Sequence, residues 1–239
     1  MIEQARAELA PTGVLRAGIN LSNFLLVTGK SESGEPQGVS PSMAAEIGCR
    51  LGVEVEYVTF KTPGELADAA TDDVWDIGLI GAEPARAKHI NFTDAYSEIE
   101  ATYLVPEGSP LQKIADVDQA GVQICVPARA AFELWLTDNI QHATIHRADR
   151  SRVLEDFIEL KMDALAGLRA GLLGNLADIP GARILNGKFT SVQQAIGVRK
   201  GRDEGLKFLS QFVADAKVEG LVGKLINQFG VDGRLTVAP

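Results

Sequence analysis

A turn that combines a cation with backbone donors is the strongest candidate for chemistry in this sequence. It lies in GAEPARAKHINF, directly after the short apolar run Ile77–Ile80. Gly81, Ala82 and Glu83 predict a tight turn, and Pro84 suits the first position of a short helix. We therefore expect backbone N–H groups and a helix dipole here that can bind an anion.

Arg86 falls in the first turn of that expected helix, where the dipole disfavours a cation unless an anion is bound beside it. Its planar guanidinium can hold a carboxylate through two parallel hydrogen bonds. Alternatively, Arg86 pairs with Glu83 at the i, i+3 spacing on the helix surface. The spacing by itself leaves both interpretations open.

Motifs for other chemistries are missing from the sequence. His142 and His146 stand four residues apart, but neither they nor His89 has Glu or Cys neighbours in the pattern of a zinc motif. The sequence has no G-x-S-x-G elbow, no Walker loop and no G-x-G-x-x-G after a strand. We expect no metal, no cofactor and no catalytic residue.

The two cysteines, Cys49 and Cys125, both lie in apolar contexts that favour buried free thiols. Cys125 has no histidine near it in the sequence, which disfavours a nucleophilic role. Two such cysteines neither prove nor exclude an oxidising compartment.

Length and composition fit a globular protein of at most two domains. The 239 residues are 46% hydrophobic and 23% charged, which is enough for a packed core. The net charge of −9 is spread along the chain, so nucleic acid is not an expected partner.

Membrane and export signals are also missing from the sequence. Even the apolar segment Leu165–Ile179 carries Arg169 and Asp178, so we expect no membrane-spanning segment. The N-terminal stretch MIEQARAELAPTG has no apolar core of a secretory signal. The protein is accordingly expected to be periplasmic if a signal peptide was removed, and cytoplasmic otherwise.

The elements that must position the turn alternate between strands and helices. Val14–Asn20 predicts a strand, and Val53–Phe60 predicts a second one. Between them we expect a helix that has Ser40 as its cap and Pro41 at its first position, and that ends at Gly52. A capping box, Thr62-Pro63-x-Glu65, then begins another helix. This alternation continues and predicts an α/β fold with mostly parallel sheets flanked by helices.

Two extended segments, Glu100–Val105 and Gln193–Val198, separate two such α/β sets. We expect two lobes joined by these hinge strands, with residues 1–100 and 194–239 in lobe one and residues 101–193 in lobe two. The cleft between two such lobes is the expected binding site.

The order VLRAGIN, GEPQGVSPSMAAEIGCRLG, DIGLIGAEPARAKHINFTDAYSE, GVQICVPARAAFELWL, MDALAGL and QQAIGVRKG resembles the type II periplasmic solute-binding proteins. The similarity is to the polar amino-acid branch, solute-binding family 3, which serves ABC importers. It covers about residues 14 to 229, and its most specific feature is the spacing of Arg86 from Phe92. The resemblance implies a monomer that binds a small ligand and docks transiently on an ABC permease, with Arg86 holding the ligand's α-carboxylate.

Lobe one departs from the family pattern at several ligand positions. Gly81 replaces a hydroxyl residue, and Glu83 replaces a threonine that would donate to the ligand. Glu83 could accept from an ammonium or hydroxyl group, or simply stabilise its own helix. Asn20 and Asn23, with Phe24 adjacent, replace acidic and aromatic contacts, and they either touch the ligand or hold their loop.

Lobe two departs further from the family. Arg129-Ala130 stands where the family has Gly-Ser or Gly-Thr at a helix start, and the added cation favours an anionic ligand. Leu168, followed by Arg169, stands where an aspartate would hold an α-ammonium. A buried ammonium without a carboxylate costs several kcal/mol, so either Glu83 replaces the aspartate or the ligand lacks the amine. Exposure to water is the alternative for both Arg129 and Arg169.

These residues predict a binding protein that closes its two lobes on a small carboxylate-bearing metabolite, an amino acid or an organic acid. Phe24 and Phe60 could form an apolar wall, whereas Trp135 is expected in the core.

Two rival functions remain. One is a dehydratase on the same fold that acts on a prephenate-like dicarboxylate and would use the same arginines as clamps. Glu83 is its only candidate general acid, and Arg86 beside it would favour the ionised form. Product formation from prephenate or arogenate would distinguish this enzyme from a binding protein. The other rival is a cytoplasmic ligand sensor, motivated by the missing signal sequence.

Overall fold

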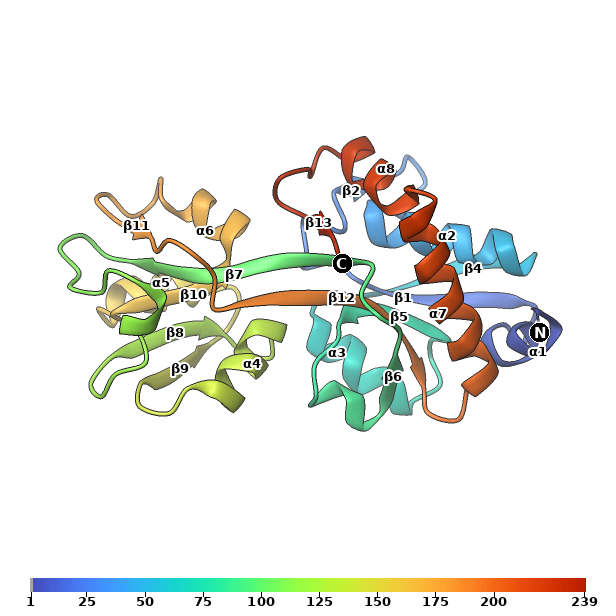
Figure 1. Cartoon of the computed structure of the whole chain (residues 1–239), viewed down its shortest axis with the longest axis horizontal. Coiled ribbons are helices and arrows are strands. Elements are labelled where there is room, and N and C mark those ends of the chain that lie inside the picture. Colours follow the sequence, from blue (N-terminus) through green and yellow to red (C-terminus); the bar gives the residue numbers. More distant parts are fainter. Residues whose placement is uncertain (1) are drawn as a thin grey trace. The chain divides into compact units, whose positions relative to one another are not determined.

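The computed structural model describes residues 2–239 and divides into two compact units. Among the described residues, unit 1 is formed by residues 2–98 and Gln193–Pro239, and unit 2 by Ile99–Val192. Two long strands, β7 (Ser97–Val105) and β12 (Thr190–Arg199), carry the chain from one unit to the other (Figure 1). They contain the two segments expected as hinge strands. The α/β class is confirmed.

The sheet of unit 1 is built on parallel pairing. The first strand, β1 (Val14–Asn20), pairs in parallel with β4 (Glu54–Phe60) on one side and with β5 (Ile77–Gly81) on the other. β12 runs antiparallel to β5, and β6 (Ile90–Phe92) runs antiparallel to β12. β5 is buried at every position, as its apolar sequence predicts for a central strand.

The first half of unit 1 also contains a small hairpin, two helices and a 3-10 turn. A small hairpin, β2 (Gly29–Lys30) with β3 (Pro36–Gln37), precedes α2 (Val39–Leu51). The next helix, α3 (Pro63–Asp68), continues into a single 3-10 turn, η1 (Ala69–Thr71).

Two helix starts can be compared with their predictions. Thr62 caps α3 as expected, since its hydroxyl accepts from the Glu65 N–H at 3.2 Å. The prediction that Ser40 caps α2 is wrong. Gly38 precedes that helix, and the Ser40 hydroxyl instead lies 2.9 Å from the Tyr96 hydroxyl. Gly38 adopts φ 148°, where a Cβ would lie 2.3 Å from the Leu26 carbonyl oxygen, so glycine is required there.

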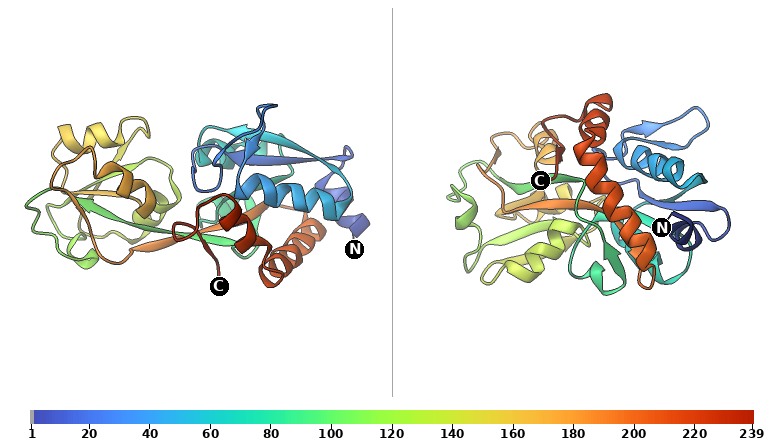
Figure 2. Two further views of the ribbon diagram at one scale, coloured as in Figure 1. Left: turned by 90° about the horizontal axis from the view of Figure 1, so that it is seen from above. Right: turned by 45° about the vertical axis from the view of Figure 1, so that its right-hand side comes forward.

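The remaining helices of unit 1 pack beside α2. After β12 the chain forms α7 (Asp203–Val218) and α8 (Leu221–Gln228), which lie next to α2 (Figures 1 and 2). A short strand, β13 (Thr236–Val237), then pairs with the start of β7. Within residues 2–239, every helix is too short or too polar to cross a bilayer.

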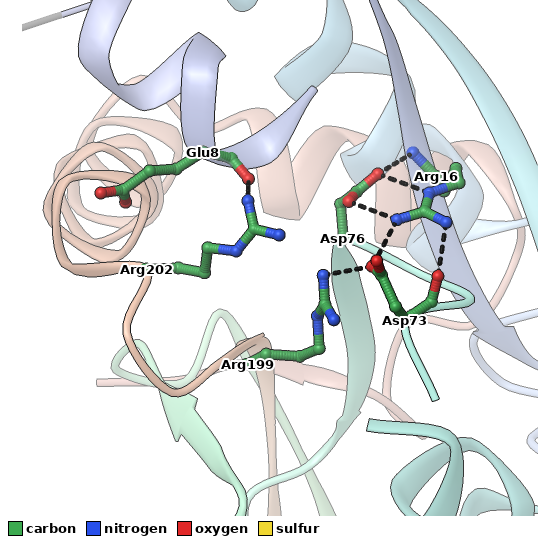
Figure 3. A network of polar contacts seen from close by, with 6 residues as sticks. All are labelled: Glu8, Arg16, Asp73, Asp76, Arg199 and Arg202. Atoms are coloured by element: carbon green, nitrogen blue, oxygen red, sulfur yellow. Dashed lines mark hydrogen bonds and ion pairs between the residues drawn. The ribbon is translucent and has the colours of Figure 1, made fainter. Parts of the chain in front are cut away.

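The N-terminal segment forms a helix that the sequence did not reveal. This helix, α1 (Ile2–Leu9), buries Ala5 and Leu9 completely and packs on α7. The Glu8 carboxylate accepts from the Gly205 N–H at 2.8 Å in the first turn of α7, and its backbone carbonyl accepts from Arg202 (Figure 3). A carboxylate at a helix start is favourable, so α1 stabilises the α7 N-terminus.

Unit 2 repeats the parallel arrangement. Its central strand, β8 (Gln123–Pro127), pairs in parallel with β9 (Thr144–Ala148) and β10 (Ala164–Leu168). β10 and the short β11 (Arg183–Ile184) run antiparallel to β7.

Two separate cores cover the faces of this sheet. On β8, Ile124 and Val126 join the core under α4 (Ala131–Asn139), whereas Cys125 joins the core beneath α5 (Val153–Glu159) and α6 (Arg169–Asn175). The period-two alternation of a strand accounts for this division. Trp135 packs against the α4 core, its ring centroid 5.4 Å from that of Phe189, which confirms the core assignment. A further 3-10 turn, η3 (Ile114–Asp116), precedes β8.

A buried ion pair joins three strands of unit 1. Asp76, 3% exposed, accepts from Arg16 Nε at 3.0 Å and from Arg16 Nη2 at 2.8 Å (Figure 3). Arg16 also bonds Asp73, whose carboxylate pairs in turn with Arg199 at the end of β12. The hydrogen bonds that Arg16 donates to the Asp76 carboxylate raise the pKa of Arg16, against the lowering effect of desolvation. The network ties the start of β5 to β1 and β12.

We expect Asp76→Ala to lower the free energy of unfolding by about 3 kcal/mol, because Arg16 would lose its buried counter-ion. Urea denaturation would measure the change. The matched control is Asp232→Ala, since Asp232 is exposed in the same unit. Equal stability of the two variants would contradict a structural role for the Arg16–Asp76 pair.

The two cysteines differ in their surroundings. Cys125 is fully buried, as predicted, but Cys49 is exposed, so the prediction of a buried Cys49 is wrong. Cys125 lies opposite His146 in the β8–β9 register. The two residues are too far apart in the sequence for this pairing to be predicted from it. The Cys125 thiol donates to the Val153 carbonyl at 3.4 Å. Burial, with the nearby Asp156 charge, raises the pKa of Cys125 to about 11, which opposes a nucleophilic role.

We expect only Cys49 to react with a thiol reagent at pH 8 in the folded protein. The Cys125 thiol is buried, and it stays protonated at a pH well below its raised pKa. Titration with Ellman's reagent should therefore give one reactive thiol per folded chain and two in guanidinium chloride. Rapid reaction of a folded Cys49→Ser variant would contradict this assignment.

Candidate functional site

Arg86 is buried at the carboxyl end of β5, where its side chain folds back on its own turn. It is 6% exposed, and its Nη1 donates to the Gly81 carbonyl at 2.7 Å. This bond orients the guanidinium in the turn. A buried and oriented guanidinium is suited to a planar anion, because charge-assisted bonds strengthen where water is excluded.

The prediction of a helix that begins at Pro84 is wrong. The structure has only a single 3-10 turn, η2 (Arg86–Lys88), and the Glu83 carbonyl accepts from both the Arg86 and Ala87 N–H groups. One turn aligns too few peptide dipoles to act as a helix N-terminus. Any attraction for an anion at this turn therefore comes from the Arg86 side chain itself.

The other turn residues are engaged within unit 1. The Ala82 N–H donates to the Gln193 carbonyl at 2.8 Å, so this donor is already used by β12. Glu83 is only 9% exposed. Ala82, Glu83 and Pro84 line a hollow of about 570 Å³ together with Phe92 and Leu206.

The loop after β1 is held by its own amides. Asn20 Oδ1 accepts from both the backbone N–H and the hydroxyl of Ser22, at 3.1 and 2.8 Å. Asn23 Oδ1 accepts from the Leu25 N–H at 3.2 Å. These are Asx turns, which correspond to the loop-holding alternative for both residues.

The two aromatic candidates of unit 1 differ in exposure. Phe24 lies on the loop after β1 and is 46% exposed, as several other large apolar side chains of the described residues are. Phe60, at the end of β4, is half-buried and packs against the core formed around Leu66 and Trp75. Phe24 is therefore the more available of the two for a ligand.

In unit 2, Arg129 and Ala130 form the entry to α4. Arg129 adopts φ 62°, an uncommon backbone conformation for a residue with a side chain, and Ala130 is 2% exposed. The Arg129 N–H donates to the Glu133 carboxylate at 3.0 Å. That carboxylate, three residues into the helix entry, stabilises the α4 N-terminus.

Glu133 is the residue of this region that the sequence did not reveal. It is 3% exposed, and its Oε1 accepts from Arg147 Nε at 2.7 Å and from the Thr137 hydroxyl at 2.8 Å. Its position three residues after Ala130 could have indicated that Glu133 stabilises the start of α4, because acids are favoured in the first turn of a helix. Arg147 is distant in sequence and gave no local signal.

Leu168 and Arg169 lie at the end of β10. Leu168 is half-buried and packs against the α4 core. Arg169 Nε donates to Glu100 on β7 at 2.9 Å, and its Nη2 donates to the Gly187 carbonyl. Arg169 therefore has a counter-ion in its own unit, and its guanidinium is not simply exposed to water as the alternative interpretation had it.

No three His, Cys, Asp or Glu side chains gather at a metal-binding spacing within residues 2–239. His146 lies 3.3 Å from the Asp156 carboxylate, as one partner of an ion pair when protonated.

The sequence profile of the bacterial extracellular solute-binding proteins, family 3, matches residues 18–232. No curated protein sequence matches the chain at a significant level.

Solved structures with the same fold cover nearly the whole chain. A solute receptor for L-cysteine of Neisseria gonorrhoeae superposes with a TM-score of 0.76 at 18% identity, over 98% of this chain and 99% of that one. A mutant of the arginine-binding protein ArgBP of T. maritima gives 0.74 at 22% identity, over 95% and 100%. The ancestral amino acid-binding protein AncCDT-1, a precursor of cyclohexadienyl dehydratase, gives 0.72 at 22% identity, over 93% and 97%. At these identities the similarity shows the fold, a two-lobed type II periplasmic-binding-protein architecture.

We expect Glu133→Ala to lower the free energy of unfolding by about 3 kcal/mol, because Arg147 and the Arg129 N–H would lose a buried carboxylate. Thermal or urea unfolding would measure the change. Glu155→Ala is the control, since Glu155 pairs with Arg152 on the surface. A Glu133→Ala variant as stable as this control would show that the carboxylate does not hold the α4 entry.

Proposed function

Because the chain belongs to family 3 of the bacterial extracellular solute-binding proteins, we propose that it binds a small carboxylate-bearing metabolite for an ABC importer. The ligand class is an amino acid or an organic acid. The observation that carries the proposal is Arg86, a buried guanidinium oriented by the Gly81 carbonyl at the end of a central strand.

The geometry of Arg86 supports carboxylate capture. A guanidinium that is already oriented loses little further freedom when an anion binds, which lowers the entropic cost of binding. Its planar donors match the two oxygens of a carboxylate. In this proposal Gly81, Ala82 and Glu83 shape the turn around that carboxylate, and Phe24 and Phe60 supply the apolar contact.

The unit 2 contacts in the proposal are Arg129 and Ala130, at the entry to α4. Arg169 is a less direct contact, because a ligand would have to compete with Glu100 for its guanidinium. Asn20 and Asn23 contribute by fixing the loop that carries Phe24.

Whether the protein can bind a ligand that carries an amine depends on Glu83. Leu168 provides no carboxylate for an ammonium, so an amino-acid ligand requires Glu83 in that role. An organic acid without an amine requires no such partner.

We propose that the two lobes close on the ligand and that β7 and β12 act as the hinge strands. The loaded protein would then dock transiently on an ABC permease. A ligand that contacts both lobes stabilises the closed state by its differential contacts.

A dehydratase is the second candidate function. It is favoured by the fold shared with AncCDT-1, which is described as a precursor of cyclohexadienyl dehydratase. The buried Glu83 would be the general acid. We favour binding, because a general acid must remain protonated and the neighbouring Arg86 cation opposes protonation.

We expect Arg86→Lys to weaken ligand binding at least about 100-fold, because an ammonium cannot reproduce the two parallel bonds of a guanidinium. A thermal-shift screen of amino acids, dicarboxylates and aromatic acids would first identify the ligand. Saturation at a hundred times Kd should add ~2.7 kcal/mol of stability. Calorimetry would then compare the variants.

Lys88→Ala is the matched control, since Lys88 lies exposed in the same 3-10 turn. Thermal unfolding of each ligand-free variant separates a binding defect from loss of the Gly81 bond. Undiminished affinity in a folded Arg86→Lys protein would refute the carboxylate assignment.

A further inference from the structure

One buried amide of unit 1 has no hydrogen-bond partner for its side chain. Gln194 lies on β12 and is 3% exposed. Within residues 2–239, no hydrogen bond joins its side chain to another residue. Its backbone is engaged, since the Gln194 carbonyl accepts from the Tyr96 N–H at 2.9 Å. A buried amide without a partner lowers the stability of the fold, so its presence requires an explanation.

Other buried polar side chains of the same unit are paired. Ser40 bonds the Tyr96 hydroxyl, and Asp76 binds Arg16. The Thr93 hydroxyl accepts from a backbone N–H of β12 at 3.2 Å. An unpaired polar side chain is therefore an exception in this unit.

The Gln194 amide can also be reached from outside the protein. In the described part of the chain, the fully buried side-chain atoms without a partner are Ser97 Oγ and Arg199 Nε, so both amide atoms of Gln194 touch accessible surface. Ser97 is 0% exposed, and its hydroxyl is closed to a ligand. Gln194 thus combines a buried side chain with an amide that lies at a small opening.

The strand register places Gln194 beside the Gly81 turn. Gln194 pairs with Gly81, the last residue of β5, in the antiparallel β5–β12 ladder. The next hydrogen bond of the ladder runs from the Ala82 N–H to the Gln193 carbonyl, so Gly81 and Gln194 form a non-hydrogen-bonded pair. In such a pair the two side-chain positions share one face and lie close together. Gly81 has no side chain, so Gln194 alone supplies a side chain to this pair.

Gly81 connects this amide to the proposed carboxylate site. Its carbonyl accepts from Arg86 Nη1 at 2.7 Å, while its Cα faces Gln194 across the ladder. All three residues belong to unit 1, and the paired strands hold Gly81 and Gln194 more precisely than a loop would. A carboxylate held by Arg86 therefore brings the adjoining carbon of the ligand toward the Gln194 amide.

We propose that Gln194 binds a neutral polar substituent, a hydroxyl or keto oxygen, on the carbon next to the carboxylate, so that the ligands are 2-hydroxy or 2-keto acids. This inference rests on the proposed function, in which Arg86 holds the carboxylate. An amide can donate to a keto oxygen and can both donate to and accept from a hydroxyl, but it has no charge to offset a buried ammonium. Gln194 is then a specificity-determining residue that favours a neutral substituent.

Calorimetry on the whole protein tests this with three matched sets of acids. The sets are butyrate, 2-hydroxybutyrate, 2-oxobutyrate and 2-aminobutyrate; glutarate, 2-hydroxyglutarate, 2-oxoglutarate and glutamate; and phenylpropionate, phenyllactate, phenylpyruvate and phenylalanine. In at least one set we expect the hydroxy or keto acid to bind at least about tenfold tighter than its unsubstituted parent, equivalent to ~1.4 kcal/mol. It should also bind tighter than the amino acid of that set.

Gln194→Leu should remove this preference and leave the affinity for the unsubstituted parent unchanged, because leucine has a similar size but no hydrogen-bonding group. The melting temperature of the ligand-free variant should equal or exceed that of the unmodified protein, since no bond is lost. Gln211→Leu is the control, because Gln211 lies exposed on α7, and this variant should keep the preference.

Three results would overturn the inference. The first is a preference that persists in Gln194→Leu, and the second is tighter binding of the amino acid than of its hydroxy and keto counterparts. The third is a lower melting temperature of Gln194→Leu with unchanged affinities, which would show that a bound water satisfies the amide.

The same titrations separate this inference from the proposed function. If the parent acids bind and Arg86→Lys abolishes their binding, but no substituent improves it, only the role of Gln194 fails. If none of the acids binds to the unmodified protein, both proposals fail.

Discussion

Parallel strand pairing is the constraint on which both units depend. In each unit three parallel strands end at one edge of the sheet, so the segments that follow them come together although they are distant in sequence. In unit 1 this edge carries Asn20, Phe60 and the Gly81 turn. In unit 2 it carries the segments that begin with Arg129 and Arg169. These candidate ligand contacts follow from this pairing.

Matching of charges inside each unit decides which cations remain for a ligand. Asp76 neutralises Arg16 beneath the unit 1 sheet, and Glu133 neutralises Arg147 beside α4. Such buried pairs contribute to the stability of the fold mainly because neither charge is left unpaired, since the cost of desolvation offsets much of the attraction between the two charges. A structural role is similarly favoured over ligand binding for Arg169, because Glu100 already binds its guanidinium.

Several expectations failed because tertiary contacts replaced local ones. Ser40 has the residue type of a helix cap, but its hydroxyl meets Tyr96, which lies 56 residues away. Pro84 suits a helix start, yet the chain forms one 3-10 turn and then joins β12 through β6. Cys49 lies in an apolar stretch of sequence, yet its side chain is exposed on α2. For Ser40 the deciding partner lay far along the chain.

The sequence by itself determined the α/β class, the alternation of strands and helices, and the family, because apolar periodicity, caps such as Thr62, and the spacing of Arg86 from Phe92 are local patterns. It also identified the arginines as candidate anion contacts. Only the tertiary structure decided which cations are neutralised. The pairs of Glu133 with Arg147 and of Glu100 with Arg169 depend on strand register and on packing between distant segments, and no local pattern in one sequence encodes those distances.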